Sequence, residues 1–160
     1  MFLDLPSYTA FHTILSLIAI VAGIVAVAGL FGRERQPVWN TLFLTSAALT
    51  SITGFGFPYL RLMPAHVIGV LSIIVLAVAA LARYRFQLRG PWRRIYGVSA
   101  VTGLYFLVFV LIAQAFLKVA ALNALAPTQS EPPFAVAQGI TFVLFVALGI
   151  AVARRRPAGP

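Results

Sequence analysis

The composition of this 160-residue chain excludes an ordinary soluble domain. Hydrophobic residues make up 61% of it and charged residues 9%, and the mean hydropathy is +0.99, whereas soluble domains average roughly 45–50% apolar and about 25% charged residues. The absence of cysteine excludes disulfides and thiolate metal sites, and the net charge of +9 does not indicate a nucleic-acid partner, because the basic residues flank apolar segments.

Five apolar segments, each close to the roughly 20 residues that cross a bilayer, predict five membrane-spanning helices. In chain order they cover residues 8–31, 38–57, 64–82, 95–116 and 134–153. An interfacial extension of the fourth segment as far as Leu125 fits the apolar residues that follow it. Helices are expected because an unpaired backbone amide in lipid costs several kcal/mol. The predicted fold class is all-α, a single transmembrane helical bundle comprising residues 1–160.

The positions of the basic residues predict the orientation of these helices. Most of them fall in the first and third loops and in the C-terminal tail, and these are Arg33, Arg35, Arg83, Arg85, Arg89, Arg93, Arg94, Arg154, Arg155 and Arg156. Only Arg61 and Lys118 fall on the other side. Because cytoplasmic loops carry the excess of Lys and Arg, the N-terminus is predicted to lie outside and the C-terminus in the cytoplasm.

Polar side chains gather at the outer end of every predicted helix. His12 lies there on the first segment, residues 50–56 on the second, and His66 on the third. Gln114 and Gln138 lie there on the last two segments, where we expect them to meet and to complete a cofactor-binding site with the histidines. The pattern predicts a polar cup, open to the outside, above an apolar inner plug.

Helical phase indicates which face of the first segment packs against a neighbour. Small residues and His12 recur there every three or four positions, as His12, Ser16, Ala19, Gly23 and Ala26. Such stripes let membrane helices approach closely. We therefore expect this face, with His12 on it, to turn toward another helix.

Two histidines at similar depth on parallel helices are the candidate ligand-binding residues. Neutral imidazole is the commonest metal ligand and also an axial ligand of haem. One hypothesis is a haem b held by His12 and His66. Its aromatic walls would come from Phe11, Phe55, Phe57 and Phe106. Another is a divalent metal, zinc or copper, held by both histidines and a carboxylate, Glu131 or Asp4. A third is that each histidine bonds a carbonyl or reaches the interface and binds no ligand.

The three acidic residues, Asp4, Glu34 and Glu131, lie in tails or loops, so no carboxylate is available near the middle of the membrane to couple transport to protons. This pattern favours binding or sensing, in a redox or sensory role, over conduction. The alternatives are a non-enzymatic accessory or assembly protein, which contacts a second copy or another membrane protein through its helices, and a small oligomeric transporter. No motif indicates a catalytic residue, and whether the chain is an enzyme is left open.

The outer loop before the last helix contains Pro127, Pro132 and Pro133, which restrict its backbone. Ser130 or Glu131 just ahead of a proline is typical of a helix start. The loop is expected either to cap the last helix or to fold over the cup as a lid.

Three stretches of the chain, residues 49–55, 104–110 and 124–134, read LTSITGF, LYFLVFV and ALAPTQSEPPF. They resemble segments of an uncharacterised family of small proteobacterial polytopic inner-membrane proteins. That resemblance implies a bacterial inner membrane and a periplasmic location for the cup, but no activity. A histidine at the start of each of two helices is also similar, loosely, to small b-type membrane cytochromes, although those proteins bury more histidines at two depths.

Overall fold

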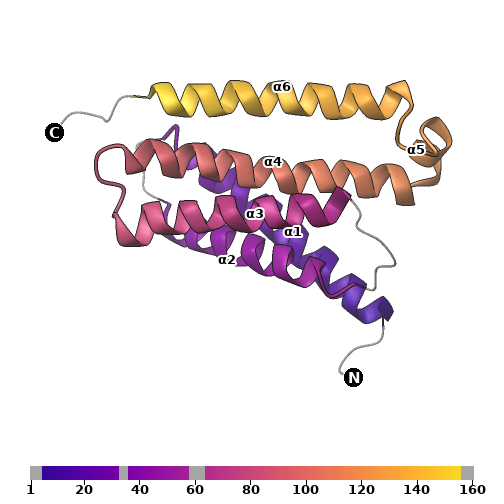
Figure 1. The fold of residues 1–160 in the computed structure, drawn as a ribbon, viewed down its shortest axis with the longest axis horizontal. Helices are drawn as coiled ribbons and strands as arrows, with labels where there is room; N and C mark the ends of the chain where they lie inside the picture. The colour runs from indigo at the N-terminus through magenta and orange to yellow at the C-terminus, as the bar shows by residue number, and fades with distance from the viewer. Residues whose placement is uncertain (1–4, 33–35, 58–63, 156–160) are drawn as a thin grey trace.

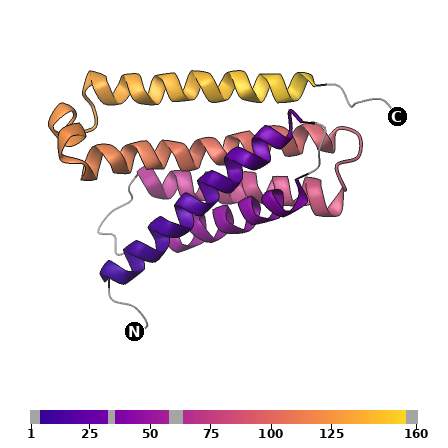
Figure 2. The ribbon, with the colours of Figure 1, turned by 180° about the vertical axis from the view of Figure 1, so that it is seen from behind.

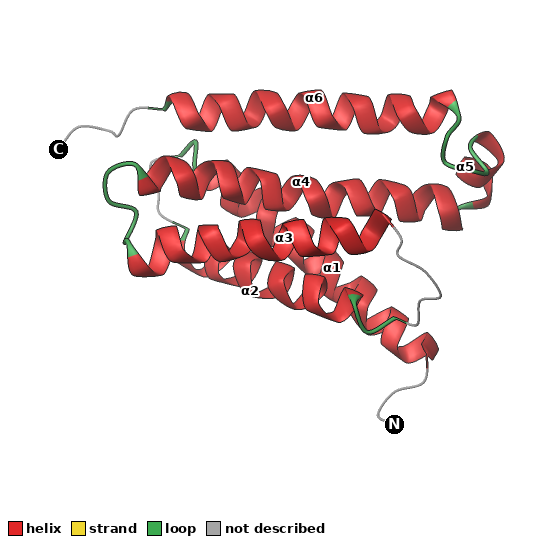
Figure 3. Cartoon of the chain, viewed as in Figure 1, coloured by secondary structure: helices red, strands yellow, loops and turns green. Residues whose placement is uncertain are grey.

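The computed structural model describes residues 5–32, 36–57 and 64–155, and within these ranges it confirms an all-helical protein without strands (Figures 1 and 3). The helices are α1 (Leu5–Gly29), α2 (Pro37–Gly54), α3 (Pro64–Ala80), the π-helical turn η1 (Leu81–Arg85), α4 (Trp92–Lys118), the short α5 (Ala120–Leu125) and α6 (Pro132–Arg154). Figure 1 shows the long helices lying side by side, with α6 along the outside of α4.

Among the described residues, four helices are long and apolar enough to cross a membrane. They cover Pro6–Gly29, His66–Arg85, Trp92–Lys118 and Pro132–Arg154. The chain therefore has the architecture of an integral membrane protein. The helix α2 is shorter, at 18 residues, and carries serine and threonine along much of its course, which lowers its hydropathy.

Most helix ends differ from the expected ones by one to three residues, and two differ in the form of the backbone. The third helix does not stop near residue 82 but continues through η1, where the amide of Phe86 bonds the carbonyl of Leu81 at 3.0 Å. Gln87, Leu88 and Gly90 then adopt left-handed backbone angles (φ 51°, 57° and 53°) and turn the chain into α4. The helix α4 ends at Lys118, so the expected interfacial extension forms the separate helix α5.

The core is centred on Phe43 of α2, whose side chain is completely buried. Its ring lies against Gly23 of α1, where an added Cβ would come within 2.8 Å of it, and against Gly103 of α4, where the distance would be 3.6 Å. Ala19 and Ala26, one turn to either side of Gly23, are 0% and 1% exposed. The small-residue stripe expected on the first helix is therefore its packing face.

A buried polar contact joins α2 to α4 closer to the arginine-rich turn. Tyr96, only 2% exposed, donates its hydroxyl hydrogen to Oδ1 of Asn40. The guanidinium of Arg83 lies 5.8 Å from the centre of the Tyr96 ring. Because a buried hydroxyl or amide without a partner costs about 1–3 kcal/mol, this pair holds the two helices in one register.

Helix α6 lies outside the bundle and packs along α4 (Figures 1 and 2). Val152 fits against Gly97, where any Cβ would collide with it. At its C-terminal end Arg155 donates to the carbonyl of Leu30 at 2.6 Å and lies over the Phe31 ring. Most of the remaining surface of α6 is exposed.

Because the approach of α1 to α2 depends on the missing side chain at residue 23, Gly23→Ala should destabilise the bundle. Overpacking of this kind costs about 1–3 kcal/mol. The matched control is Gly139→Ala on α6, where an added Cβ meets nothing within 4 Å. Thermal unfolding in detergent, followed by circular dichroism, should show a lower midpoint for Gly23→Ala and an unchanged one for the control. Equal midpoints would contradict the proposed packing.

Candidate functional site

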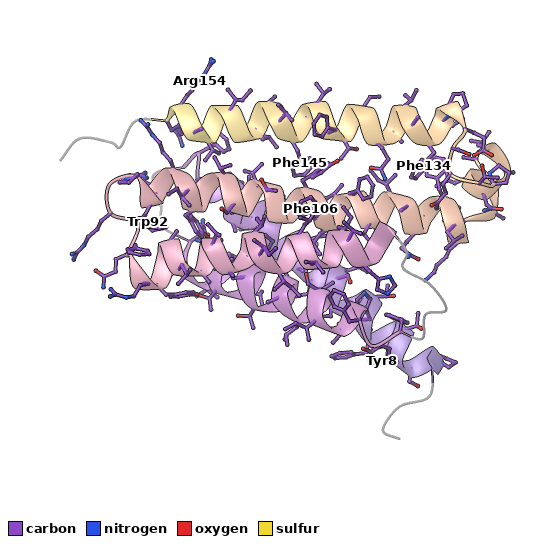
Figure 4. The ribbon with its side chains drawn as sticks, viewed as in Figure 1. Tyr8, Trp92, Phe106, Phe134, Phe145 and Arg154 are labelled. Atoms are coloured by element: carbon purple, nitrogen blue, oxygen red, sulfur yellow. The ribbon has the colours of Figure 1, made fainter. Side chains whose placement is uncertain are left out.

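The bundle has two chemically different ends. The described arginines lie at the end that we call the basic end, and they are Arg83, Arg85, Arg89, Arg93, Arg94, Arg154 and Arg155. The opposite end, which we call the histidine end, holds the starts of α1, α3 and α6. Figure 4 shows Trp92 and Arg154 at the basic end and Tyr8 and Phe134 at the other. Figure 2 shows α1 running obliquely, so that its first turns lie away from α4 and α6.

His12 is held at the histidine end by the last turn of α2. Its Nδ1 lies 2.9 Å from Oγ1 of Thr53, and its ring meets Phe57 edge-on at 5.1 Å. One turn earlier on α1, the hydroxyl of Tyr8 donates to the backbone carbonyl of Thr53 at 2.6 Å. Gly56 makes this possible, since any Cβ there would occupy the position of the Tyr8 hydroxyl.

The hydrogen bonds around Thr53 assign the tautomer of His12. The Thr53 hydroxyl donates its one hydrogen to a carbonyl of its own helix, that of Leu49 at 2.7 Å. Its oxygen is therefore an acceptor toward His12, whose Nδ1 must carry the hydrogen. A neutral imidazole protonated on Nδ1 keeps a lone pair on Nε2. This is the arrangement found in metal-binding histidines, whose second nitrogen donates to a nearby oxygen.

His66 lies on the other side of the end of α2. Its ring centre is 6.0 Å from that of Phe55, and the same phenyl ring fills the space beside Gly69, where an added Cβ would be 3.1 Å from it. The two histidines thus pack against different aromatic residues of the short segment that follows α2, His12 against Phe57 and His66 against Phe55. Both are half-buried.

The two glutamines do not meet. Gln138 is buried and its Nε2 donates to the carbonyl of Phe109 at 3.0 Å, while Gln114 is exposed on α4. A third glutamine, Gln129 of the loop before α6, donates to the carbonyl of Ala113 at 2.6 Å. Glutamines therefore fasten α6 and its loop to two carbonyls that are one turn apart on α4.

The described residues contain no cluster of three His, Asp, Glu or Cys side chains that could share a metal ion. His12, His66 and Glu131 therefore do not form one site here. The carboxylate suggested as an alternative, Asp4, lies outside the described residues, as do Arg33, Glu34, Arg35, Arg61 and Arg156. Of the aromatic walls expected for a haem, Phe55 and Phe57 lie beside the histidines, Phe11 is exposed, and Phe106 lies near the middle of α4.

Glu131 closes the loop before α6. Its carboxylate accepts hydrogen bonds from the hydroxyl and amide of Thr128, at 2.8 and 3.2 Å, and from the amide of Ser130 at 3.1 Å. Desolvation alone would raise the pKa of Glu131, but these bonds outweigh it and lower the pKa below its ordinary value. The residue stands at the N-cap of α6, yet its side chain bonds the loop and not the helix, because prolines occupy the first two helical positions and supply no amide.

Sequence reasoning missed the roles of Tyr8, Asn40 and Tyr96. Each carries a polar group within or beside an apolar segment, and such a group in lipid needs a partner inside the protein. That requirement was the available signal, but the partner residues lie more than 40 positions away in the chain.

A scan against protein-family models and searches of curated proteins and of solved structures found no match for this chain.

Replacing Thr53 by valine should release the His12 ring from its single tautomer, because the acceptor of the Nδ1 hydrogen is lost. We expect the ¹⁵N chemical shifts of the His12 ring to move toward a mixture of tautomers. Thr13→Val is the control, since the Thr13 hydroxyl is exposed and bonds only the carbonyl of Thr9. If Thr53→Val left the ring shifts of His12 unchanged, the tautomer assignment would be refuted.

Acidification should loosen the loop closed by Glu131. Because its folded pKa is lowered, the carboxylate contributes fully above the ordinary value of 4.5 and loses its contribution as the pH falls through the lowered value. The amide shifts of Thr128 and Ser130 should therefore titrate together, with a midpoint below 4.5. Glu131→Gln should remove the transition, and a midpoint above the ordinary value would argue against these hydrogen bonds.

Proposed function

We propose that the chain crosses a bacterial inner membrane five times, with the basic end in the cytoplasm and the histidine end facing the periplasm. The grouping of the described arginines at one end supports this orientation, because cytoplasmic ends of membrane proteins carry the excess of positive charge. Lys118 is the basic residue described at the opposite end. The resemblance of residues 49–55, 104–110 and 124–134 to small proteobacterial inner-membrane proteins supports the choice of membrane.

In this proposal α2 also crosses the membrane, in addition to the four helices that are long and apolar enough by themselves. Its 18 residues measure about 27 Å, close to the hydrocarbon thickness of about 30 Å. Its polar side chains are compatible with lipid because the helix satisfies several of them itself. The hydroxyls of Ser46, Ser51 and Thr53 donate to carbonyls of the preceding turn at 2.6 to 2.9 Å. Ser46, Thr50 and Ser51 are also buried against neighbouring helices.

We further propose that the histidine end binds haem b or a divalent metal ion, with Nε2 of His12 as the principal ligand, in a redox or sensory role. The observation that supports this most is the 2.9 Å contact between Nδ1 of His12 and Thr53, which orients the ring and leaves the lone pair on Nε2. His66 is the candidate second ligand. Its ring packs against Phe55, with 6.0 Å between the two ring centres.

Titration of the purified protein with haem, and separately with Zn²⁺ and Cu²⁺, tests the proposal. We expect one equivalent to bind, His12→Ala to abolish binding, and Thr53→Val to weaken it about 10–100-fold, the usual effect of losing such an outer partner. Thr13→Val should bind like the unmodified protein. With haem, the absorption spectrum distinguishes one histidine ligand from two, and His66→Ala should change that spectrum only if His66 is a ligand.

Saturable binding that survives His12→Ala, or no binding of any of the three probes, would refute this function. Circular dichroism of each variant separates loss of the ligand site from loss of the fold. Because the Thr53 and Thr13 variants remove the same kind of hydroxyl from neighbouring helices, a difference between them reports on His12 and not on general stability.

The second candidate function is that of an accessory protein that binds another membrane protein or a second copy. The observation in its favour is that α6 packs along α4 and leaves large apolar side chains on its outer face, including Val143 at 66% and Ile140 at 63% exposure. Co-purification of a partner without any haem or metal would favour this reading. Phe43 and the alanines around it fill the half of the bundle near the basic end. This packing does not favour a small transporter.

A further inference from the structure

A groove between α4 and α6, which none of the residues around His12 lines, has the properties of a second ligand site. Its volume is about 400 Å³, and it is lined from α4 by residues that include Thr102, Tyr105 and Phe106 and from α6 by residues that include Phe142, Phe145 and Gly149. Figure 4 shows Phe145 projecting from α6 toward α4. The volume is in the range of sites for small organic ligands, roughly 300–1,000 Å³.

The groove is walled by aromatic rings around Tyr105. The ring centres of Phe142 and Phe145 lie 5.9 and 5.6 Å from that of Tyr105, and Phe106 on its own helix lies 5.7 Å away. Such a wall offers flat apolar surfaces against which another ring can stack. The only other hydroxyl of the lining, that of Thr102, is used by its own helix and donates to the carbonyl of Val98.

The hydroxyl of Tyr105 has no hydrogen-bond partner among the residues that the structure describes. Tyr105 lies midway along α4, 13 residues from each end, which is about 20 Å in each direction. If α4 spans the membrane, this hydroxyl lies near the centre of the bilayer, where neither water nor lipid headgroups can satisfy it and an unpaired polar group is costly. A molecule that brings an oxygen acceptor to that depth would remove the cost.

We propose that this groove binds a quinone with an apolar tail. Such a molecule dissolves in the hydrocarbon of the bilayer, its flat ring suits the aromatic wall, and its carbonyl oxygen accepts the hydrogen of Tyr105. A saturated acyl chain fills the groove equally well but offers no acceptor. The proposal concerns binding alone, and it depends on the membrane position of α4 but not on any ligand of His12.

Binding of decylubiquinone to the protein in lipid nanodiscs tests this, measured as the saturable excess over empty nanodiscs. Tyr105→Phe should weaken binding about three- to tenfold, the usual effect of losing one hydrogen bond. The control is Tyr84→Phe, which removes a tyrosine hydroxyl from an exposed position at the basic end and should change nothing. Decylbenzene, which has a ring and the same tail but no oxygen, should bind Tyr105→Phe and the unmodified protein equally.

Filling the groove gives an independent test. A leucine at position 149 would extend into it, because an added Cβ there meets only Val101 at 4.0 Å. Gly149→Leu should abolish quinone binding, while Gly139→Leu, on an open part of the same helix, should not. His12→Ala should also bind normally, so that failure here is distinguishable from failure of the haem or metal site. No saturable excess, or equal quinone affinity in Tyr105→Phe and the unmodified protein, would overturn the proposal.

Discussion

The ring of Phe43, enclosed between a glycine of α1 and a glycine of α4, is the contact on which the arrangement of the first four helices depends. Lipid gives helices no hydrophobic reason to associate, so close packing and a few hydrogen bonds must hold them together. The close packing around Phe43 and its alanine neighbours lies between Thr53 and the basic end. The hydrogen bond between Asn40 and Tyr96 lies there too. Buried side chains consequently fill the half of the bundle near the basic end, whereas α1 diverges from α4 toward the histidine end. At that end, the hydrogen bonds that the structure gives the side chains of His12 and Tyr8 both go to Thr53, in the last turn of α2.

Much of the fold could be predicted from the sequence, because lipid restricts the backbone to helices and the apolar segments mark where these run. The small-residue stripe of the first helix is confirmed as a packing face, since Ala19 and Ala26 are buried. The approach of His12 to a neighbour followed from its place on that stripe. The sequence could not say that the neighbour would be Thr53, because the partner depends on where α2 ends and how its last turn is rotated.

The expectations that depended on pairing between helices fared worse. Gln114 and Gln138 both lie toward the histidine end, but Gln114 is exposed and Gln138 donates to the carbonyl of Phe109. The inner half was expected to be an apolar plug, yet it contains the buried contact between Asn40 and Tyr96. Depth along a helix can be read from residue number, whereas rotation about its axis drifts over a long segment and is set by packing. For the same reason the groove beside Tyr105, which depends on the separation of α4 and α6, has no counterpart in the sequence pattern.

If α2 crosses the membrane together with the four more apolar helices, the start of α1 and the helix α5 lie on one side and the arginine-rich turn between α3 and α4 lies on the other. Since the chain has no native cysteine, single variants Ser7→Cys, Arg89→Cys and Ala124→Cys can be labelled without background. A membrane-impermeant maleimide added from the periplasmic side should label positions 7 and 124, which four crossings separate, and should reach position 89 only after lysis. If Ser7→Cys and Ala124→Cys were labelled from opposite sides, or if Arg89→Cys were labelled in unbroken cells, the account would be contradicted.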